Sequence, residues 1–338
     1  MKARNGFLMA TALAGMVMSS SAVSADTADK RIALSNNYAG NSWRQAMLES
    51  WTRVTGKAVE DGIVAAADAF TTAENQATEQ AAQIQNMILQ GYDAIVINAA
   101  SPTALNGAVK EACDAGITVV SFDGIVSEPC AWRVQVDFRK MGSDEIDYLA
   151  TRLPEGGNLL EIRGLAGVSV DDEIHAGIEA GVAAHPQFTI VGAVNGDWAQ
   201  DVAQKAVAGI LPSLPEIAGV VTQGGDGYGA AQAFAAAGRP TPIIVMGNRQ
   251  DELKWWAEQR DANGYETIST SIAPGVSTLA FWIAQQILDG AEVPKDLTVP
   301  FLTVDQDGLD AALENTPEGG VTNVDYSLDD AKAVIAGK

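Results

Sequence analysis

The stretch that decides the fold runs from Ala94-Ile-Val-Ile-Asn98, through an Ala-rich segment, to Val119-Val-Ser-Phe-Asp123. Short β-rich apolar runs on both sides of a helical segment predict two parallel strands joined by a crossover helix. The same pattern returns in Gly219-Val-Val-Thr-Gln223, a second Ala-rich segment, and Ile243-Ile-Val-Met-Gly247. A repeat with so long a period predicts two similar lobes, each an α/β doubly wound parallel sheet, rather than a solenoid.

Further elements extend this pattern towards the N-terminus. We expect a strand at Ile32–Leu34 and a looser strand around Gly62–Ala66. A helix over Ser42–Thr55 has Ser42 as a candidate N-cap and Gly56 just past its end. The pattern Thr71-x-x-Glu74 is a capping box, which predicts a second helix from about Ala73 to Gln90.

Composition and charge exclude several classes of protein. The chain has 338 residues, of which 47% are hydrophobic and 19% charged, so it can form one large or two medium domains with cores. Acidic residues number 43 and basic residues 21, which gives a formal charge of −22. Because a nucleic-acid-binding surface must neutralise phosphates, this balance argues against a nucleic acid as partner.

The N-terminus has the features of a secretory signal peptide. Lys2 and Arg4 precede an uncharged run from Gly6 to Met18, and Val23-Ser24-Ala25 places small residues where a cleavage site requires them. We therefore predict a signal peptide over residues 1–25, cleavage after Ala25 and a periplasmic protein. No cysteine stands at the new N-terminus, so we expect no lipid anchor, and no later stretch is long and apolar enough to span a membrane.

The two cysteines, Cys113 and Cys130, lie in the exported part of the chain. An oxidising compartment permits a disulfide, which we expect between them. Two buried free thiols are the alternative. Neither cysteine has a His or Cys at metal-ligand spacing, so no metal site is expected.

Catalytic motifs are absent from the sequence. It contains no G-x-S-x-G elbow, no H-E-x-x-H helix and no G-x-x-x-x-G-K-[ST] phosphate loop, and only His175 and His185 could supply an imidazole base. We therefore expect neither an enzyme nor a cofactor. A secreted carbohydrate-active enzyme is the competing hypothesis, for which the sequence places no base or nucleophile.

Polar and aromatic residues follow the predicted strands of both lobes. In doubly wound sheets the ligand lies beyond the carboxyl ends of the strands, so these residues are candidates for its contacts. Tryptophan faces beside Asp, Asn and Arg suit a polyhydroxylated ligand, because the rings stack on C–H faces and the charged groups bond hydroxyls. The candidate set, with Ser271 added, is Asn37, Asn41, Trp43, Arg44, Asp123, Asp172, Trp198, Asp226, Asn248, Arg249 and Ser271.

The chain after the signal peptide resembles the type I periplasmic binding proteins of ABC sugar importers, in the branch of ribose and galactofuranose binders. The segments that carry the resemblance, in chain order, are Asn41-Ser-Trp43-Arg44, Gln90–Asn98, Ala115–Asp123, Gly164–Ser169, Gly196-Asp-Trp198 and Gln223-Gly-Gly-Asp226. The resemblance implies two lobes joined by three crossover segments that close on one sugar. Their positions near Val136–Asp137, Ile272–Ser277 and Val299–Asp305 give an N-terminal lobe of residues 26–136 plus 274–303 and a C-terminal lobe of 137–273 plus 304–338.

The resemblance also implies roles for individual residues. Asn41 and Trp43 stand where the family has an amide and an aromatic platform, and Asp123 matches an aspartate that binds sugar hydroxyls. Asp172 stands where ribose binders have arginine, and Arg249 where they have aspartate, so ribose itself is not expected. Trp198 replaces a phenylalanine, Gly124 replaces an arginine that often follows the aspartate, and Arg44 is shared with galactofuranose-type members.

The function implied is a monomeric periplasmic receptor that captures a pentose, hexose or related polyol and delivers it to an inner-membrane ABC permease. Cleft residues of both charges favour a neutral ligand, whose hydroxyls both donate and accept. Two alternatives remain open: a receptor for sugar acids centred on Arg44 or Arg249, and a sensory sugar receptor of the chemotaxis type.

Overall fold

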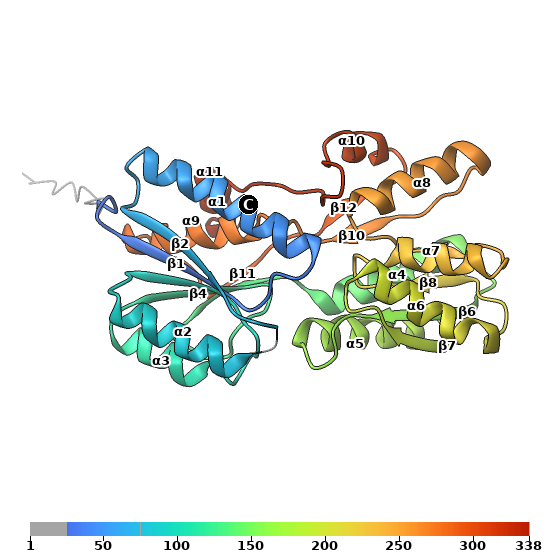
Figure 1. The fold of residues 1–338 in the computed structure, drawn as a ribbon, viewed down its shortest axis with the longest axis horizontal. Coiled ribbons are helices and arrows are strands. Elements are labelled where there is room, and N and C mark those ends of the chain that lie inside the picture. Colours follow the sequence, from blue (N-terminus) through green and yellow to red (C-terminus); the bar gives the residue numbers. More distant parts are fainter. Residues whose placement is uncertain (1–25, 75, 338) are drawn as a thin grey trace, which may run out of the picture.

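The computed structural model describes residues 26–74 and 76–337, which form two α/β lobes (Figure 1). The predicted signal peptide lies outside the described residues. Each lobe has a parallel sheet with helices on both faces, so the doubly wound architecture predicted from the repeat is confirmed. Within the described ranges, none of the helices combines the length and apolar character that a bilayer span requires.

The N-terminal lobe is built on six parallel strands. Their spatial order is β11 (Asp296–Thr298), β5 (Trp132–Gln135), β4 (Thr118–Phe122), β3 (Ala94–Asn98), β1 (Arg31–Asn36) and β2 (Ala66–Thr71). One face is covered by α1 (Ser42–Glu60), α9 (Val276–Leu288) and α11 (Leu328–Ile335), and the other by α2 (Ala77–Leu89) and α3 (Asn106–Asp114). Strand β3 is buried at every position because both faces of the sheet are covered, which accounts for its apolar sequence.

The C-terminal lobe repeats this arrangement with four parallel strands. Their order is β7 (Phe188–Asn195), β6 (Gly157–Arg163), β8 (Gly219–Val221) and β9 (Ile243–Ile244). Helices α4 (Phe138–Arg152) and α5 (Ser169–Ala184) cover one face, and α6 (Gln200–Ile210), the short turn Leu211–Ser213 and α7 (Gly227–Ala236) cover the other. The second, first, third and fourth strands of each lobe lie side by side in that order, so the sequence repeat is also a repeat of topology.

The remaining elements lie beside the C-terminal sheet. Strand β10 (Ser269–Ser271) meets the end of β9 through a bridge from Met246 to Ser269, and it pairs antiparallel with β12 (Leu302–Val304). Helices α8 (Gln250–Asn263) and α10 (Leu309–Glu314) pack together above them (Figure 1).

The described chain crosses between the lobes after β5, between β10 and α9, and between β11 and β12. It then crosses once more, from α10 to α11 (Figure 1). The predicted placement of all of 304–338 in the C-terminal lobe is therefore wrong for α11, which packs against α9 in the N-terminal lobe. The reason is local packing, because Leu328, Val334 and Ile335 join the apolar cluster around α9, and nothing in so short a helix indicates which lobe it covers.

Four of the predicted caps and element boundaries are wrong. Asn41, not Ser42, caps α1, since its side chain accepts a hydrogen bond from the Arg44 backbone N–H at 2.8 Å. The helix continues through Gly56, which is tolerated because packing of the buried face outweighs a single unfavourable residue. The strand expected around 62–66 begins only at Ala66. Because Thr71 is the last residue of this strand, it cannot begin a capping box, and α2 starts at Ala77 rather than near Ala73.

A disulfide joins Cys113 and Cys130, with an S–S distance of 2.07 Å and Cα atoms 6.4 Å apart. The predicted pairing is confirmed, and the alternative of two free thiols is wrong. The bond ties the end of α3 to the segment that leads into β5, at the outer side of the N-terminal sheet.

Glycines set the spacing of α4 and α5. A Cβ at Gly142 would lie 2.2 Å from the Ile174 carbonyl oxygen, and one at Gly177 would lie 2.0 Å from the Arg139 carbonyl oxygen. The two helix backbones are therefore in direct contact, which brings the side chains at their N-terminal ends onto one continuous surface facing the other lobe.

Candidate ligand-binding site

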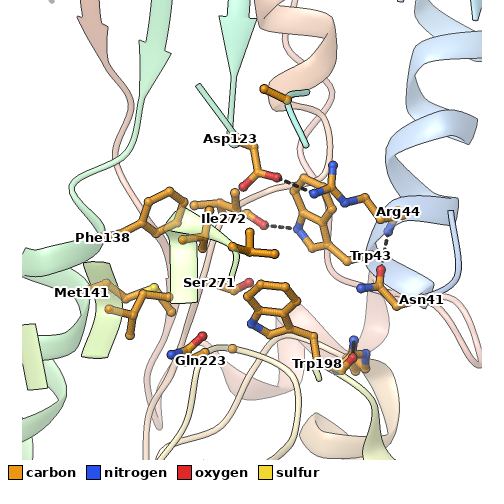
Figure 2. Close-up of a pocket in the computed structure, with 17 residues that line it drawn as sticks. Asn41, Trp43, Arg44, Asp123, Phe138, Met141, Trp198, Gln223, Ser271 and Ile272 are labelled. Atoms are coloured by element: carbon orange, nitrogen blue, oxygen red, sulfur yellow. Dashed lines mark hydrogen bonds and ion pairs between the residues drawn. The ribbon is translucent and has the colours of Figure 1, made fainter. Parts of the chain in front are cut away.

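A cavity of about 70 Å³ lies between the lobes, at the carboxyl ends of strands from both sheets (Figure 2). This is the location that the rule for doubly wound sheets predicts. Its lining residues are Asn41, Trp43, Arg44, Ala99, Asp123, Gly124, Phe138, Met141, Val168, Val170, Ile174, Trp198, Gln223, Gly224, Arg249, Ser271 and Ile272. Seven of the eleven candidates from the sequence are among them, and Asn37, Asp172, Asp226 and Asn248 are not.

A buried ion pair forms the polar end of the cavity. Arg44 Nη2 lies 3.0 Å from Asp123 Oδ2, with side chains 11% and 8% exposed. The same carboxylate oxygen accepts a hydrogen bond from Asn98 Nδ2 at 2.9 Å. Loss of hydration raises the pKa of Asp123 although Arg44 lowers it, and the same loss of hydration lowers the pKa of Arg44. A further hydrogen bond from a ligand hydroxyl would therefore stabilise the charged form of either side chain.

Two lining residues have left-handed backbones. Asp123 has a φ of 55° directly after β4, and Trp198 has a φ of 55° after β7. A non-glycine residue in this region costs on the order of 1 kcal/mol, and such strain clusters at functional sites. In both places the sharp turn at the end of a strand directs the side chain into the cavity.

Trp43 and Asn41 come from the start of α1. The indole N–H of Trp43 donates to the Ile272 carbonyl oxygen at 2.8 Å, across the boundary between the lobes (Figure 2). Its ring packs against the apolar cluster of the C-terminal lobe. Asn41 uses its side-chain oxygen to cap α1, so its Nδ2 amide remains directed to the cavity side of the cap.

Arg249 links the lobes a second time. Its Nε donates to Ser42 Oγ at 2.7 Å, from the C-terminal lobe to the first residue of α1. Its two terminal nitrogens donate to the carbonyl oxygens of Gly225 and, at 2.6 Å, Trp198. All three nitrogens of this guanidinium are thus engaged within the protein.

The four candidates that do not line the cavity have other roles. Asn37 donates to the Ala99 carbonyl oxygen at 3.1 Å, and Asn248 to that of Thr322 at 3.0 Å, so both hold loops in place. Asp226 is 0% exposed and lies beneath Arg249, 4.0 Å from Nη1. The Asp172 side chain is 70% exposed and pairs with Arg163 at 3.2 Å. Ligand contact by these four stays a prediction that the geometry does not support.

The lining residues that sequence reasoning missed are mostly apolar. Phe138 and Met141 start α4, Val170 and Ile174 start α5, and Ile272 lies in a crossover. Their position after predicted crossovers and strands was a usable signal, but apolar residues at helix starts are usually core residues. Gln223 is a polar exception. It stands two residues after the end of β8 and could have been found by the carboxyl-end rule.

Comparison with known proteins now identifies the family. The family model of the periplasmic binding protein domain matches residues 32–292. The chain belongs to this family. Over 252 residues this periplasmic binding protein is 28% identical to the xylitol-binding protein of Mycolicibacterium smegmatis, which covers 73% of this chain and 70% of the relative. It is 25% identical over 230 residues to the ribose import binding protein of Bacillus subtilis, covering 68% and 73% of the two chains.

A solved structure supports the same assignment. The ABC transporter solute binding protein from Thermobispora bispora superposes with a TM-score of 0.85 at 32% sequence identity, over 91% of this chain and 95% of that one. Periplasmic binding proteins are solute receptors rather than enzymes, which agrees with the absence of catalytic motifs in the sequence.

Proposed function

We propose that this periplasmic binding protein is exported with cleavage after Ala25 and acts as a monomer. It captures a monosaccharide or related polyol between its lobes and delivers it to an inner-membrane ABC permease. Relatives named for xylitol and ribose support this ligand class. We further propose lobe boundaries at 136/137 and 273/274 and a third between β11 and β12, with α11 returned to the N-terminal lobe. The predicted boundary at 303/304 would cut β12, which pairs along its length with β10.

The observation that carries the proposal is the cluster of Asp123, Arg44 and Asn41 at the cavity, beside two tryptophan rings. Asp123 accepts from ligand hydroxyls, and the amide of Asn41 and the guanidinium of Arg44 donate to ligand oxygens. Trp43 and Trp198 offer ring faces to C–H groups. This combination matches a small molecule that carries several hydroxyls on a carbon skeleton.

The ligand we propose is neutral. Arg44 is already paired with Asp123, and the nitrogens of Arg249 are bonded to Ser42 and to two carbonyl oxygens. A sugar acid would need an arginine whose charge is not yet compensated, or it would displace these bonds. The observed pairing therefore favours neutral sugars and polyols over sugar acids.

Closure is the second part of the mechanism. The bonds from Trp43 to the Ile272 carbonyl and from Arg249 to Ser42 both join the two lobes, so they form only when the cleft is shut. A ligand that touches both lobes stabilises this state relative to an open one, because it has differential affinity for the two. The permease then recognises the closed form.

The proposal is tested by a thermal-shift screen of pentoses, hexoses, polyols and sugar acids, followed by calorimetry on each compound that raises the melting temperature. Asp123→Asn keeps the side-chain volume and removes the charge. Because a hydrogen bond to a charged group contributes about 1.5–3 kcal/mol, we expect affinity to fall by about one to two orders of magnitude.

Asp172→Asn is the matched control, since it removes the same charge from an exposed side chain outside the cavity. It should bind like the unmodified protein. Equal affinity of folded Asp123→Asn and the unmodified protein would remove Asp123 from the site, and shifts only with sugar acids would replace the neutral ligand by an acidic one.

A further inference from the structure

The two lobes contribute unlike walls to the cavity. Where helices α4 and α5 of the C-terminal lobe line the cavity, the side chains are Phe138 and Met141 from α4, Val170 and Ile174 from α5, and Val168 just before α5. Figure 2 shows Phe138 and Met141 on one side of the cavity and Arg44 and Asn41 on the other. The part of the wall that α4 and α5 form is thus apolar, and the part that the start of α1 and the end of β4 form is polar.

The polar lining residues of the C-terminal lobe are already engaged. Gln223 Nε2 donates to Asp171 Oδ1 at 2.8 Å, and Gln223 Oε1 accepts from the Gly164 backbone N–H at 2.9 Å. Arg249 uses all its nitrogens, as described above. Among the described lining residues of this lobe, the Ser271 hydroxyl and the indole N–H of Trp198 are left as side-chain polar groups without a bond within the protein.

Trp43 makes the contrast sharper. It comes from the N-terminal lobe, but its N–H is taken by the Ile272 carbonyl oxygen and its ring packs against the apolar cluster of the C-terminal lobe. The ligand therefore meets the ring of Trp43 and not its hydrogen-bond donor. The available donors and acceptors are concentrated on Asp123, Arg44 and Asn41.

The apolar wall cannot rearrange to offer polar groups. The backbones of α4 and α5 touch at Gly142 and Gly177, so the two helices are packed closely against each other. Phe138, Met141 and Ile174 are buried, and behind them lies the apolar cluster between the helices and the sheet. A ligand hydroxyl turned towards this surface would lose its bonds to water without a replacement.

From these contacts we propose that the ligand is a deoxy sugar or deoxy polyol: one side carries the hydroxyls that Asp123, Arg44 and Asn41 bind, and a methyl or methylene group replaces a hydroxyl-bearing carbon on the side facing Val170 and Met141. This inference rests on the proposed function and narrows its ligand class.

The experiment compares ligand pairs that differ by one hydroxyl. Suitable pairs are D-fucose with D-galactose, L-rhamnose with L-mannose, 5-deoxy-D-ribose with D-ribose, and L-fucitol with galactitol, each titrated by calorimetry. An apolar pocket discriminates against one added hydroxyl by roughly 100-fold at most, and commonly by tenfold or more. We expect at least one deoxy member to bind about 10-fold to 100-fold more tightly than its hydroxylated partner.

A pair of variants assigns this preference to the wall. Val170→Thr keeps the shape of the side chain and adds a hydroxyl at the cavity, so it should reduce the preference for the deoxy ligand several-fold. Val182→Thr makes the same change in the last turn of α5, at a half-buried position that does not line the cavity, and should leave the preference unchanged.

The outcomes separate this inference from the function on which it rests. A deoxy preference that Val170→Thr reduces and Val182→Thr does not would support it. Equal or tighter binding of the hydroxylated members would overturn it while leaving a sugar receptor in place. Binding of no member of the panel by the folded protein would overturn the inference and would count against the sugar and polyol class as a whole.

Discussion

Asp226 is a buried carboxyl group without a hydrogen bond, and it allows a quantitative prediction. It is 0% exposed, and neither carboxyl oxygen has a hydrogen-bond partner within the described part of the chain. The nearest guanidinium nitrogen, on Arg249, is 4.0 Å away, too far for a hydrogen bond. Burial raises the pKa of Asp226 to about 7, although the charge of Arg249 lowers it. We predict that Asp226→Asn stabilises the protein above pH 5.

The size of the effect follows from the two pKa values. The group shifts from 3.8 to about 7 on folding, which at about 1.4 kcal/mol per pH unit corresponds to about 4 kcal/mol. Between these values the folded state binds the proton more tightly than the unfolded state. The free energy of unfolding therefore falls as the pH rises from about 4 to 7, and the carboxamide, which does not titrate, avoids this loss.

The assay is urea unfolding of the unmodified protein and of Asp226→Asn at half-unit steps from pH 4.5 to 8. The difference between the two curves isolates Asp226 from the other buried acids. Asp307→Asn, at an exposed position, is the control and should give a curve parallel to that of the unmodified protein. A constant difference between the Asp226→Asn and unmodified curves across this range would refute the argument, because it would mean that Asp226 titrates equally in both states.

Three further predictions concern the disulfide, the helix contact and the hinge. Replacing Cys113 and Cys130 together by Ser should lower the free energy of unfolding by about 2–4 kcal/mol, measured by urea unfolding against the unmodified protein with and without reductant. Gly177→Ala should lower the free energy of unfolding by about 1–3 kcal/mol because the added Cβ would meet the backbone of α4. Gly209→Ala is the control, since open space surrounds that position, and it should not destabilise the protein. Equal melting temperatures of the two variants would contradict the packing argument. Trp43→Phe keeps an aromatic face but loses the hydrogen bond to the Ile272 carbonyl oxygen. Because such a bond contributes roughly 0.5–1.5 kcal/mol, ligand affinity should fall about 2-fold to 12-fold. Unchanged affinity in calorimetry would show that this bond does not stabilise the closed form.

Several elements could be predicted from the sequence because all residues of such an element lie in the same kind of surroundings. Strand β3 begins and ends at the predicted residues, and β4 lies within one residue of the predicted stretch, since strands buried on both faces require unbroken apolar runs. The repeat predicted a second, similar lobe, and the two sheets share one strand order. The carboxyl-end rule correctly placed Asp123 and Trp198 at the cavity because strand topology alone determines where those loops lie.

Sequence reasoning failed where the exposure and the partners of a side chain depend on the residues that the fold packs around it. Asp172 and Asp226 both follow strands of the C-terminal lobe, yet the first is exposed beside Arg163 and the second is buried under Arg249. Likewise, α11 crosses back to the N-terminal lobe because an apolar surface on α9 is available to it.

The sequence by itself therefore predicted an export signal, and it indicated the two-lobed α/β architecture, the cysteine pair and the edge of the sheets where the cavity lies. Each of these follows from composition or from a periodicity that can be read along the chain. Only the tertiary structure decided which polar groups of the site remain available to a ligand. Gln223 and Arg249 are ligand candidates by residue type, but their hydrogen bonds are taken by Asp171, Ser42 and backbone carbonyls, because a buried polar group bonds to whatever partner the fold brings within 3 Å or so.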